Sequence, residues 1–212
     1  MTFITLEGPE GAGKSTQLSR LAEAVRAAGR EVTVTREPGG TPEGEALRAL
    51  LLDPDRAWSP LAEALLMNAA RDAHLRGLIE PALEAGQVVL CDRFFDSTRA
   101  YQHEVGAGTL AAIHDAVVRR RPDLTLLLDL SVETGLERAE ARGRADRFEG
   151  KGIGYHESVR RAFLAIAAAE PERIAVIDAA EGQDDVTKAL LAAVHERLPG
   201  LLGTGDGPPS AA

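Results

Sequence analysis

Cysteine is almost absent from this chain, and its scarcity limits what the protein can be. The one cysteine, Cys91, excludes an internal disulfide and fits a reducing compartment. Three apolar residues precede it, which predicts a buried thiol rather than a reactive one. The five histidines show no paired spacing of the kind that metal ligands have, so we expect no zinc site.

Positive charge and long apolar runs are also lacking. The 24 basic and 33 acidic residues give a net charge of −9, which argues against a nucleic-acid polymer as partner. We find no signal peptide and no apolar run of about 18 residues, so we expect no membrane association and a cytoplasmic location. With 212 residues, 44% of them hydrophobic, the chain can form one domain with a sizeable core.

Short apolar runs alternate with helical patterns along the chain. Five segments predict strands: 2–7, which reads as a buried strand, 31–35, which alternates between apolar and polar residues, and 87–92, 124–130 and 173–178. Ser59 and Pro60 predict the start of a long helical region that continues to about residue 85, with a break near Pro81. This alternation predicts an α/β fold, a parallel sheet with helices on both faces. We expect one domain over 1–198 and a disordered tail over 199–212, where glycine and proline are frequent.

The segment GPEGAGKS (8–15) carries the strongest single signal. It matches the pattern G-x-x-x-x-G-K-S and stands between a predicted strand and a predicted helix. In such a loop, backbone N–H groups and the helix N-terminus surround a phosphate. We expect Lys14 to face solvent and reach the β- and γ-phosphates, and the Ser15 hydroxyl to bind Mg²⁺. The expected nucleotide-binding residues are Gly8, Pro9, Glu10, Gly11, Ala12, Gly13, Lys14, Ser15 and Thr16.

A second group of charges indicates a second anion. The motifs Asn-Lys-x-Asp and Asp-x-x-Gly, which a GTPase would need, are both missing from the sequence. Arg36 and Arg93 stand at the carboxyl ends of predicted strands, which line the ligand crevice of an open α/β sheet. Arg71 lies on the long central helix. These arginines favour a phosphorylated acceptor; a motor or a nucleotide-dependent regulatory switch is the alternative.

Three segments together resemble bacterial thymidylate kinases in order and spacing, over residues 2 to about 195. They are TREPGGT (35–41), DRFFDSTRAYQ (92–102) and ARGRADRFE (141–149). The resemblance implies a P-loop nucleoside-monophosphate-kinase fold: a five-stranded parallel sheet with a short lid at about 141–153, usually dimeric through its central helices. It also implies transfer of the γ-phosphoryl group of ATP to dTMP with Mg²⁺. A kinase for another deoxynucleotide or for a deoxynucleoside is the alternative enzyme.

The resemblance further implies a role for each substrate-binding position. Glu10 would contact the sugar 3′-hydroxyl, and Tyr101 would crowd the 2′ position. Asp92 would help to place Mg²⁺ and the phosphates. The other positions serve the acceptor phosphate (Arg36 and Arg93) and the thymine base (Arg71, Ser97 and Thr98).

At one position the sequence differs from the usual residue of the family, and at another it indicates which of two forms of the family it resembles. Met67 stands where the family often has a phenylalanine, and its flexible side chain could still cover the thymine ring. Gly11 stands where one form of the family carries a catalytic arginine. The other form supplies this arginine from the lid. We therefore expect the catalytic residues to be Lys14, Asp92, Arg93, Arg142, Arg144 and Arg147.

Overall fold

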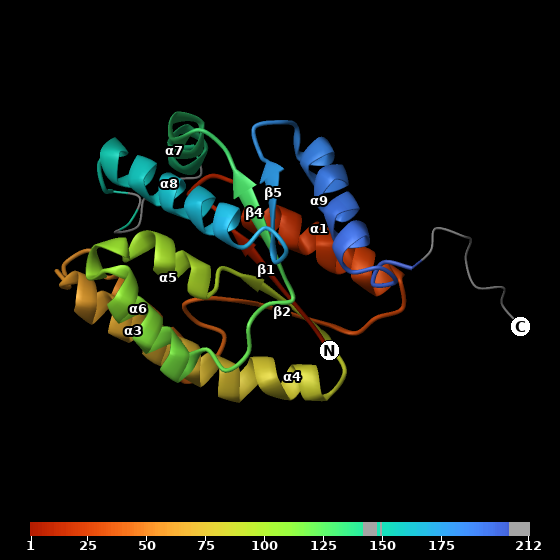
Figure 1. Cartoon of the computed structure of the whole chain (residues 1–212), viewed down its shortest axis with the longest axis horizontal. Coiled ribbons are helices and arrows are strands. Elements are labelled where there is room, and N and C mark those ends of the chain that lie inside the picture. The colour runs from red at the N-terminus through yellow and green to blue at the C-terminus, as the bar shows by residue number, and fades with distance from the viewer. Residues whose placement is uncertain (142–147, 149, 204–212) are drawn as a thin grey trace, which may run out of the picture.

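The computed structural model describes residues 1–141, 148 and 150–203. Five parallel strands form one sheet in the order β2-β3-β1-β4-β5, with helices on both faces (Figure 1). The five strands are β1 (Thr2–Glu7), β2 (Val32–Arg36), β3 (Val88–Asp92), β4 (Leu124–Asp129) and β5 (Ile174–Asp178). The two ends of each strand lie within one residue of the predicted ends, which is the usual uncertainty of a strand boundary. The expected five-stranded α/β fold is therefore confirmed.

The helices follow the strands in the alternation that the sequence indicates. They are α1 (Lys14–Ala27), α2 (Pro42–Leu52), α3 (Pro60–His74), α4 (Glu80–Glu84), α5 (Phe95–Tyr101), α6 (Ala107–Val117), α7 (Val132–Glu140), α8 (Ile153–Ala169) and α9 (Gln183–Arg197). A π-helical turn, η1 (Leu75–Ile79), joins α3 to α4, and a 3₁₀ turn, η2 (His103–Val105), joins α5 to α6. Within the described part of the chain, no helix is both long and apolar enough to cross a membrane.

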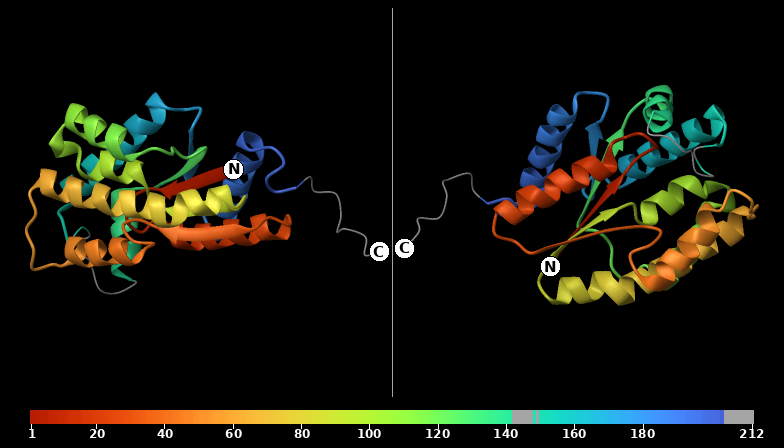
Figure 2. Two further views of the ribbon diagram at one scale, coloured as in Figure 1. Left: turned by 90° about the horizontal axis from the view of Figure 1, so that it is seen from below. Right: turned by 180° about the vertical axis from the view of Figure 1, so that it is seen from behind.

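The apolar core is divided between the two faces of the sheet. On one face, Leu21 of α1 and Leu190 of α9 pack against Ile4 and Leu126 of the strands. On the other face, α4, α5 and α8 cover the sheet, and α2 packs on α3 outside them. Seen from behind in Figure 2, α1 and α9 lie together on one side of the sheet.

The long helical region contains the expected interruption. Ser59 caps it, and its side chain accepts a hydrogen bond from the Ala62 N–H at 3.2 Å. Pro81 has no N–H to donate to a carbonyl one turn earlier, and the wider turn η1 directly precedes α4, where Pro81 lies. The predicted break is therefore a short change from α-helix to π-helix between α3 and α4, and the helical region continues through it.

The carboxyl-terminal end of the chain packs further than the sequence suggests. Leu201 is buried in the core cluster that includes α1 and α9. Packing thus continues past residue 198, where we expected the tail to begin. Residues 204–212 lie outside the described residues, and the division into a kinase domain and a disordered tail stays a prediction.

Candidate active site

The loop between β1 and α1 takes the shape that its glycines permit. Gly8 and Gly11 have φ angles of 141° and 73°, in the range that glycine adopts most readily. A Cβ atom at Gly8 would lie 2.3 Å from the Leu128 carbonyl oxygen. A Cβ atom at Gly11 would lie 2.0 Å from the carbonyl oxygen of Gly135 in α7. Both positions therefore require glycine for conformation and for space.

Lys14 is buried, and the expectation that it faces solvent is wrong. Its side chain folds back over the loop, where Nζ donates to the carbonyl oxygens of Gly8 at 3.1 Å and Pro9 at 2.8 Å. The residue is only 8% exposed. Burial and the neighbouring Arg93 guanidinium lower the pKa of Lys14 to about 8. The ammonium group is held inside the loop, at the place where a phosphate would enter.

Ser15 and Asp92 meet across the gap between α1 and β3. The Ser15 hydroxyl donates to Asp92 Oδ2 at 2.9 Å, and Asp92 Oδ1 is buried without a hydrogen-bond partner. A buried carboxylate oxygen of this kind favours a cation or water as its partner. The described residues contain no cluster of three His, Cys, Asp or Glu that could hold a metal ion. The pair fits Mg²⁺, which is commonly bound by one or two protein groups together with substrate phosphates.

Arg93 lies at the centre of the site, directly after β3. It has a left-handed backbone with φ 68°, which is uncommon for a residue with a side chain. Its guanidinium donates to Glu10 Oε1 at 2.6 Å, to the Gly8 carbonyl oxygen at 3.0 Å and to Ser97 Oγ at 3.2 Å. It also stacks over the Tyr101 ring, 5.0 Å from the centroid. One arginine thus connects the phosphate-binding loop to α5.

Glu10 carries its negative charge toward the same point. Its Oε1 atom accepts a second hydrogen bond, from the Tyr101 hydroxyl at 2.9 Å. Burial alone would raise the pKa of Glu10, but the positive charges of Arg93 and Lys14 outweigh it and lower the pKa to about 2. The carboxylate is therefore ionised at neutral pH and can accept a hydrogen bond from a hydroxyl group.

Arg71 reaches the site from α3 and is almost completely enclosed, with 2% exposure. Its Nε donates to Glu37 Oε2 at 2.8 Å and its Nη1 to Asn68 Oδ1 at 2.9 Å. Its Nη2 donates to Thr98 Oγ1 at 3.0 Å. Glu37 Oε1 also forms a hydrogen bond with His74 Nδ1 at 3.1 Å, and the His74 side chain is fully buried. The guanidinium is fixed in one orientation before any ligand arrives.

One cleft of about 230 Å³ joins these groups. All of the substrate-binding residues that the sequence predicts line it, and so do both predicted magnesium ligands. These are Glu10, Ser15, Arg36, Met67, Arg71, Asp92, Arg93, Ser97, Thr98 and Tyr101. Arg36 is the most exposed of the three arginines and forms an ion pair with Glu45 at 3.0 Å. The structure thus brings the predicted residues together, and their individual roles stay predictions.

The cleft also contains residues that sequence reasoning missed. They are Glu37, Pro38, Arg48, Leu52, Phe94, Gln102 and Phe148. Two of them carry a signal in the sequence: Glu37 directly follows Arg36, and Gln102 ends the segment DRFFDSTRAYQ. Gln102 Nε2 donates to Glu63 Oε1 at 2.7 Å, which turns its amide away from solvent. The predicted lid arginines, Arg142, Arg144 and Arg147, lie outside the described residues.

A phosphate-binding loop beside a cleft lined by arginines is the arrangement of a P-loop phosphotransferase, which brings a nucleotide donor and a phosphorylated acceptor together. Comparison with known proteins narrows this class. Residues 6–190 match the family model described as thymidylate kinase. The chain therefore belongs to the thymidylate kinase family.

Individual relatives agree with this assignment. A thymidylate kinase from Caulobacter vibrioides is 54% identical, over 92% of this chain and 97% of the relative. One from Deinococcus radiodurans is 49% identical over the same shares of the two chains. The solved structure of thymidylate kinase from Ehrlichia chaffeensis is similar with a TM-score of 0.76 and 30% identity, over 91% of this chain and 98% of that one. The similarity spans both the loop and the arginine-lined cleft.

Proposed function

We propose that this protein transfers the γ-phosphoryl group of ATP to dTMP and releases ADP and dTDP. Membership of the thymidylate kinase family supports this function. The observation that carries it in this chain is the cleft of about 230 Å³, which Arg36 and Arg93 line together with the loop residues Glu10 and Ser15, and in which the buried Arg71 donates to Thr98. The arginines beside the loop suit phosphates, and the pair of Arg71 and Thr98 suits the polar edge of a base.

We propose the following division of the cleft between the two substrates. The loop at 8–16, with Lys14, holds the phosphates of ATP. Arg36 and Arg93 hold the phosphate of dTMP, and the ionised Glu10 accepts a hydrogen bond from the 3′-hydroxyl. The base lies between Met67 and the polar groups of Arg71, Ser97 and Thr98, while Tyr101 lies against the sugar.

This arrangement needs no general base. The dTMP phosphate has a second pKa near 6, so its attacking oxygen is already charged at neutral pH. Catalysis then depends on holding the two phosphates in line, excluding water and neutralising the transferring group. Arg93 suits this task because it contacts Gly8 and Glu10, two residues of the phosphate-binding loop. A phosphate bound to Arg93 would therefore lie next to the donor site. The arginines expected in the lid, Arg142, Arg144 and Arg147, would supply further positive charge.

Ser15 and Asp92 would hold Mg²⁺. The bound ion would supply positive charge at the donor phosphates.

We further propose that the protein is a cytoplasmic homodimer. Leu61 and Leu65 lie four residues apart on α3 and are 46% and 51% exposed, so they share one side of this helix. An apolar side of a central helix favours pairing with the same surface of a second copy.

The decisive experiment compares possible acceptors in one assay. Purified protein with MgATP should release ADP rapidly with dTMP, slowly with dUMP, and only at background rates with dGMP or thymidine. A preference for dGMP or thymidine would support a different deoxynucleotide or deoxynucleoside kinase. Tight nucleotide binding without acceptor-dependent ADP release would support a regulatory switch.

A further inference from the structure

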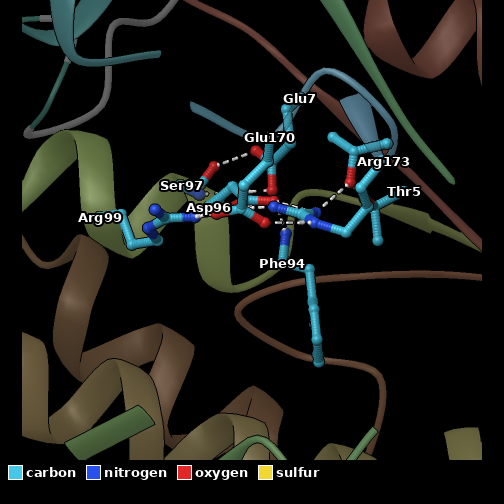
Figure 3. A network of polar contacts seen from close by, with 9 residues as sticks. Thr5, Glu7, Phe94, Asp96, Ser97, Arg99, Glu170 and Arg173 are labelled. Atoms are coloured by element: carbon cyan, nitrogen blue, oxygen red, sulfur yellow. Dashed lines mark hydrogen bonds and ion pairs between the residues drawn. The ribbon is translucent and has the colours of Figure 1, made fainter. Parts of the chain in front are cut away.

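The carboxylate of Glu7, the last residue of β1, is completely buried under the site. Three donors reach it, all from the segment that follows Arg93 (Figure 3). Glu7 Oε1 accepts from the Phe94 N–H at 2.8 Å and the Ser97 N–H at 3.3 Å. Glu7 Oε2 accepts from the Ser97 hydroxyl at 2.5 Å. The side chain thus binds the N-terminus of α5, which carries the cleft residues Ser97, Thr98 and Tyr101.

A second buried carboxylate, Asp96, lies beside Glu7 and has different partners. It forms ion pairs with Arg173 at 2.7 Å and with Arg99 at 2.9 Å (Figure 3). Arg173 also donates to Thr125 Oγ1 at 2.7 Å, so Asp96 ties α5 to β4 through Arg173. The two carboxylates therefore anchor the same helix to different strands: Asp96 to β4 through Arg173, and Glu7 to the end of β1.

The Glu7 contacts converge on Arg93. The Arg93 N–H donates to the Leu6 carbonyl oxygen at 2.9 Å, and the next N–H in the chain donates to Glu7. The end of β1 thus holds the strained left-handed backbone of Arg93 from both sides. The side chain is held as well, because Ser97 Oγ accepts from Arg93 Nη1 while its own proton points to Glu7.

Ionised Glu7 can only accept hydrogen bonds, and this sets the direction of the chain of contacts. Its Oε2 atom accepts a hydrogen bond from the Ser97 hydroxyl, which leaves a lone pair of Ser97 Oγ to accept from Arg93. Burial and the neighbouring Asp96 raise the pKa of Glu7 to about 7, against the lowering effect of its hydrogen bonds and of Arg93. The ionised form is therefore the main one in a moderately alkaline buffer.

We propose that Glu7 is a positioning residue for the acceptor phosphate: through Ser97 and the backbone at Phe94, it fixes the direction in which Arg93 presents its guanidinium. This inference rests on the proposed function, in which Arg93 binds that phosphate. Glu7 does not line the cleft and acts only through its neighbours.

The test is Glu7→Gln, studied at about pH 8, where the native carboxylate is ionised. Glutamine keeps the shape but presents an amide NH₂ on one side, so it cannot accept from all three donors. The Kd for dTMP should rise roughly ten- to hundredfold, the range for losing one charge-assisted hydrogen bond. The Kd for thymidine should stay within about twofold, because thymidine has no phosphate for Arg93 to bind. An equal loss for both ligands, or no loss for either, overturns the proposal.

Asp96→Asn is the matched control. It alters an equally buried carboxylate that lies on α5 itself and pairs with Arg99 and Arg173 instead of Ser97. This variant should lower Tm and leave the Kd for dTMP within about twofold of the parent. If Asp96→Asn weakens dTMP binding as much as Glu7→Gln does, the effect is general loosening of α5 and the positioning role is wrong.

A double variant tests the route through Ser97. If Glu7 acts through the Ser97 hydroxyl, Glu7→Gln adds little to the loss in dTMP affinity that Ser97→Ala already causes. Fully additive losses overturn this route. Should Glu7→Gln fail to fold, Ser97→Ala takes its place: both ligands then lose the base contact proposed for Ser97, and dTMP should lose affinity further because Arg93 is released as well. An equal loss of both ligands in Ser97→Ala also overturns the proposal. The parent enzyme separates the two hypotheses, since failure of the parent to phosphorylate dTMP refutes the proposed function itself.

Discussion

Replacing Arg93 with glycine should weaken dTMP binding far more than ATP binding. Glycine is the better replacement because Arg93 has φ 68°. A left-handed backbone costs a residue with a Cβ about 1–2 kcal/mol, and glycine avoids this cost. The variant therefore loses the guanidinium without adding backbone strain at the end of β3, and any fall in its Tm reports the lost contacts of the guanidinium, above all the ion pair with Glu10.

The size of the effect follows from the contacts of Arg93. Its guanidinium is held by Glu10, Gly8 and Ser97 at 2.6, 3.0 and 3.2 Å, so it is oriented before dTMP arrives. Removing one partner of a largely buried charge pair costs about 2–5 kcal/mol, and this corresponds to roughly a 30- to 5,000-fold rise in Kd. The released Glu10 adds repulsion toward the incoming phosphate. Adding Glu10→Gln to the glycine variant should therefore recover part of the loss.

Calorimetry with dTMP and with ATP, each titrated alone, measures this difference. We expect the Kd for dTMP to rise at least 30-fold, the lower end of that range, and the Kd for ATP to change by less than about threefold. Arg76→Ala is the control, since Arg76 is exposed and pairs with Asp72 away from the cleft. Equal losses for dTMP and ATP in the Arg93 variant refute its assignment to the acceptor phosphate.

Three further predictions concern the donor, the base and the lid. Lys14 keeps its positive charge below its lowered pKa of about 8, so the affinity of the parent for MgADP should fall as the pH rises through that value. The Lys14→Ala variant should bind MgADP weakly at every pH, and an affinity of the parent that does not change with pH contradicts the prediction. Because buried polar groups contact the base, dUMP should react with a kcat/KM lower than that of dTMP by the equivalent of about 1–3 kcal/mol, and dGMP with one lower by a factor of ~10⁴ or more. Similar kcat/KM values for dGMP and dTMP would refute selection for thymine. Joint replacement of the lid arginines by alanine should lower kcat at least ~10³-fold in single-turnover assays. A change within about tenfold rules out the lid mechanism. The replaced residues are Arg142, Arg144 and Arg147.

Much of the fold could be predicted because it depends on local patterns. Four of the strands are short apolar runs and β2 alternates between apolar and polar residues, and helices of suitable period separate them, so the five strands and their order along the chain follow directly. The π-helical turn at 75–79 was predicted only as a break near Pro81. How a helix accommodates a proline depends on the packing around it, which a local pattern does not contain.

The candidate site divides in a similar way. Arg36 and Arg93 follow strands, so topology alone brings them to one edge of the sheet. The burial of Lys14 was missed because it depends on how the loop folds back over the side chain. Glu7 was missed because it ends an apolar strand, and its burial is stabilised by donors about 90 residues later in the chain. Such long-range hydrogen bonds leave no periodic signal in a sequence.

The contact between Gly11 and Gly135 has a consequence for how this family can change over time. A side chain at Gly11 would collide with the backbone of α7, and a side chain at Gly135 would lie 2.5 Å from the Glu10 carbonyl oxygen. A single mutation that placed an arginine in the loop would therefore disturb the loop before it could serve catalysis. The arginine therefore becomes acceptable only together with a shift of the helix, so the two changes depend on each other. We expect chains of this family with an arginine at this place to show a wider gap between the loop and α7.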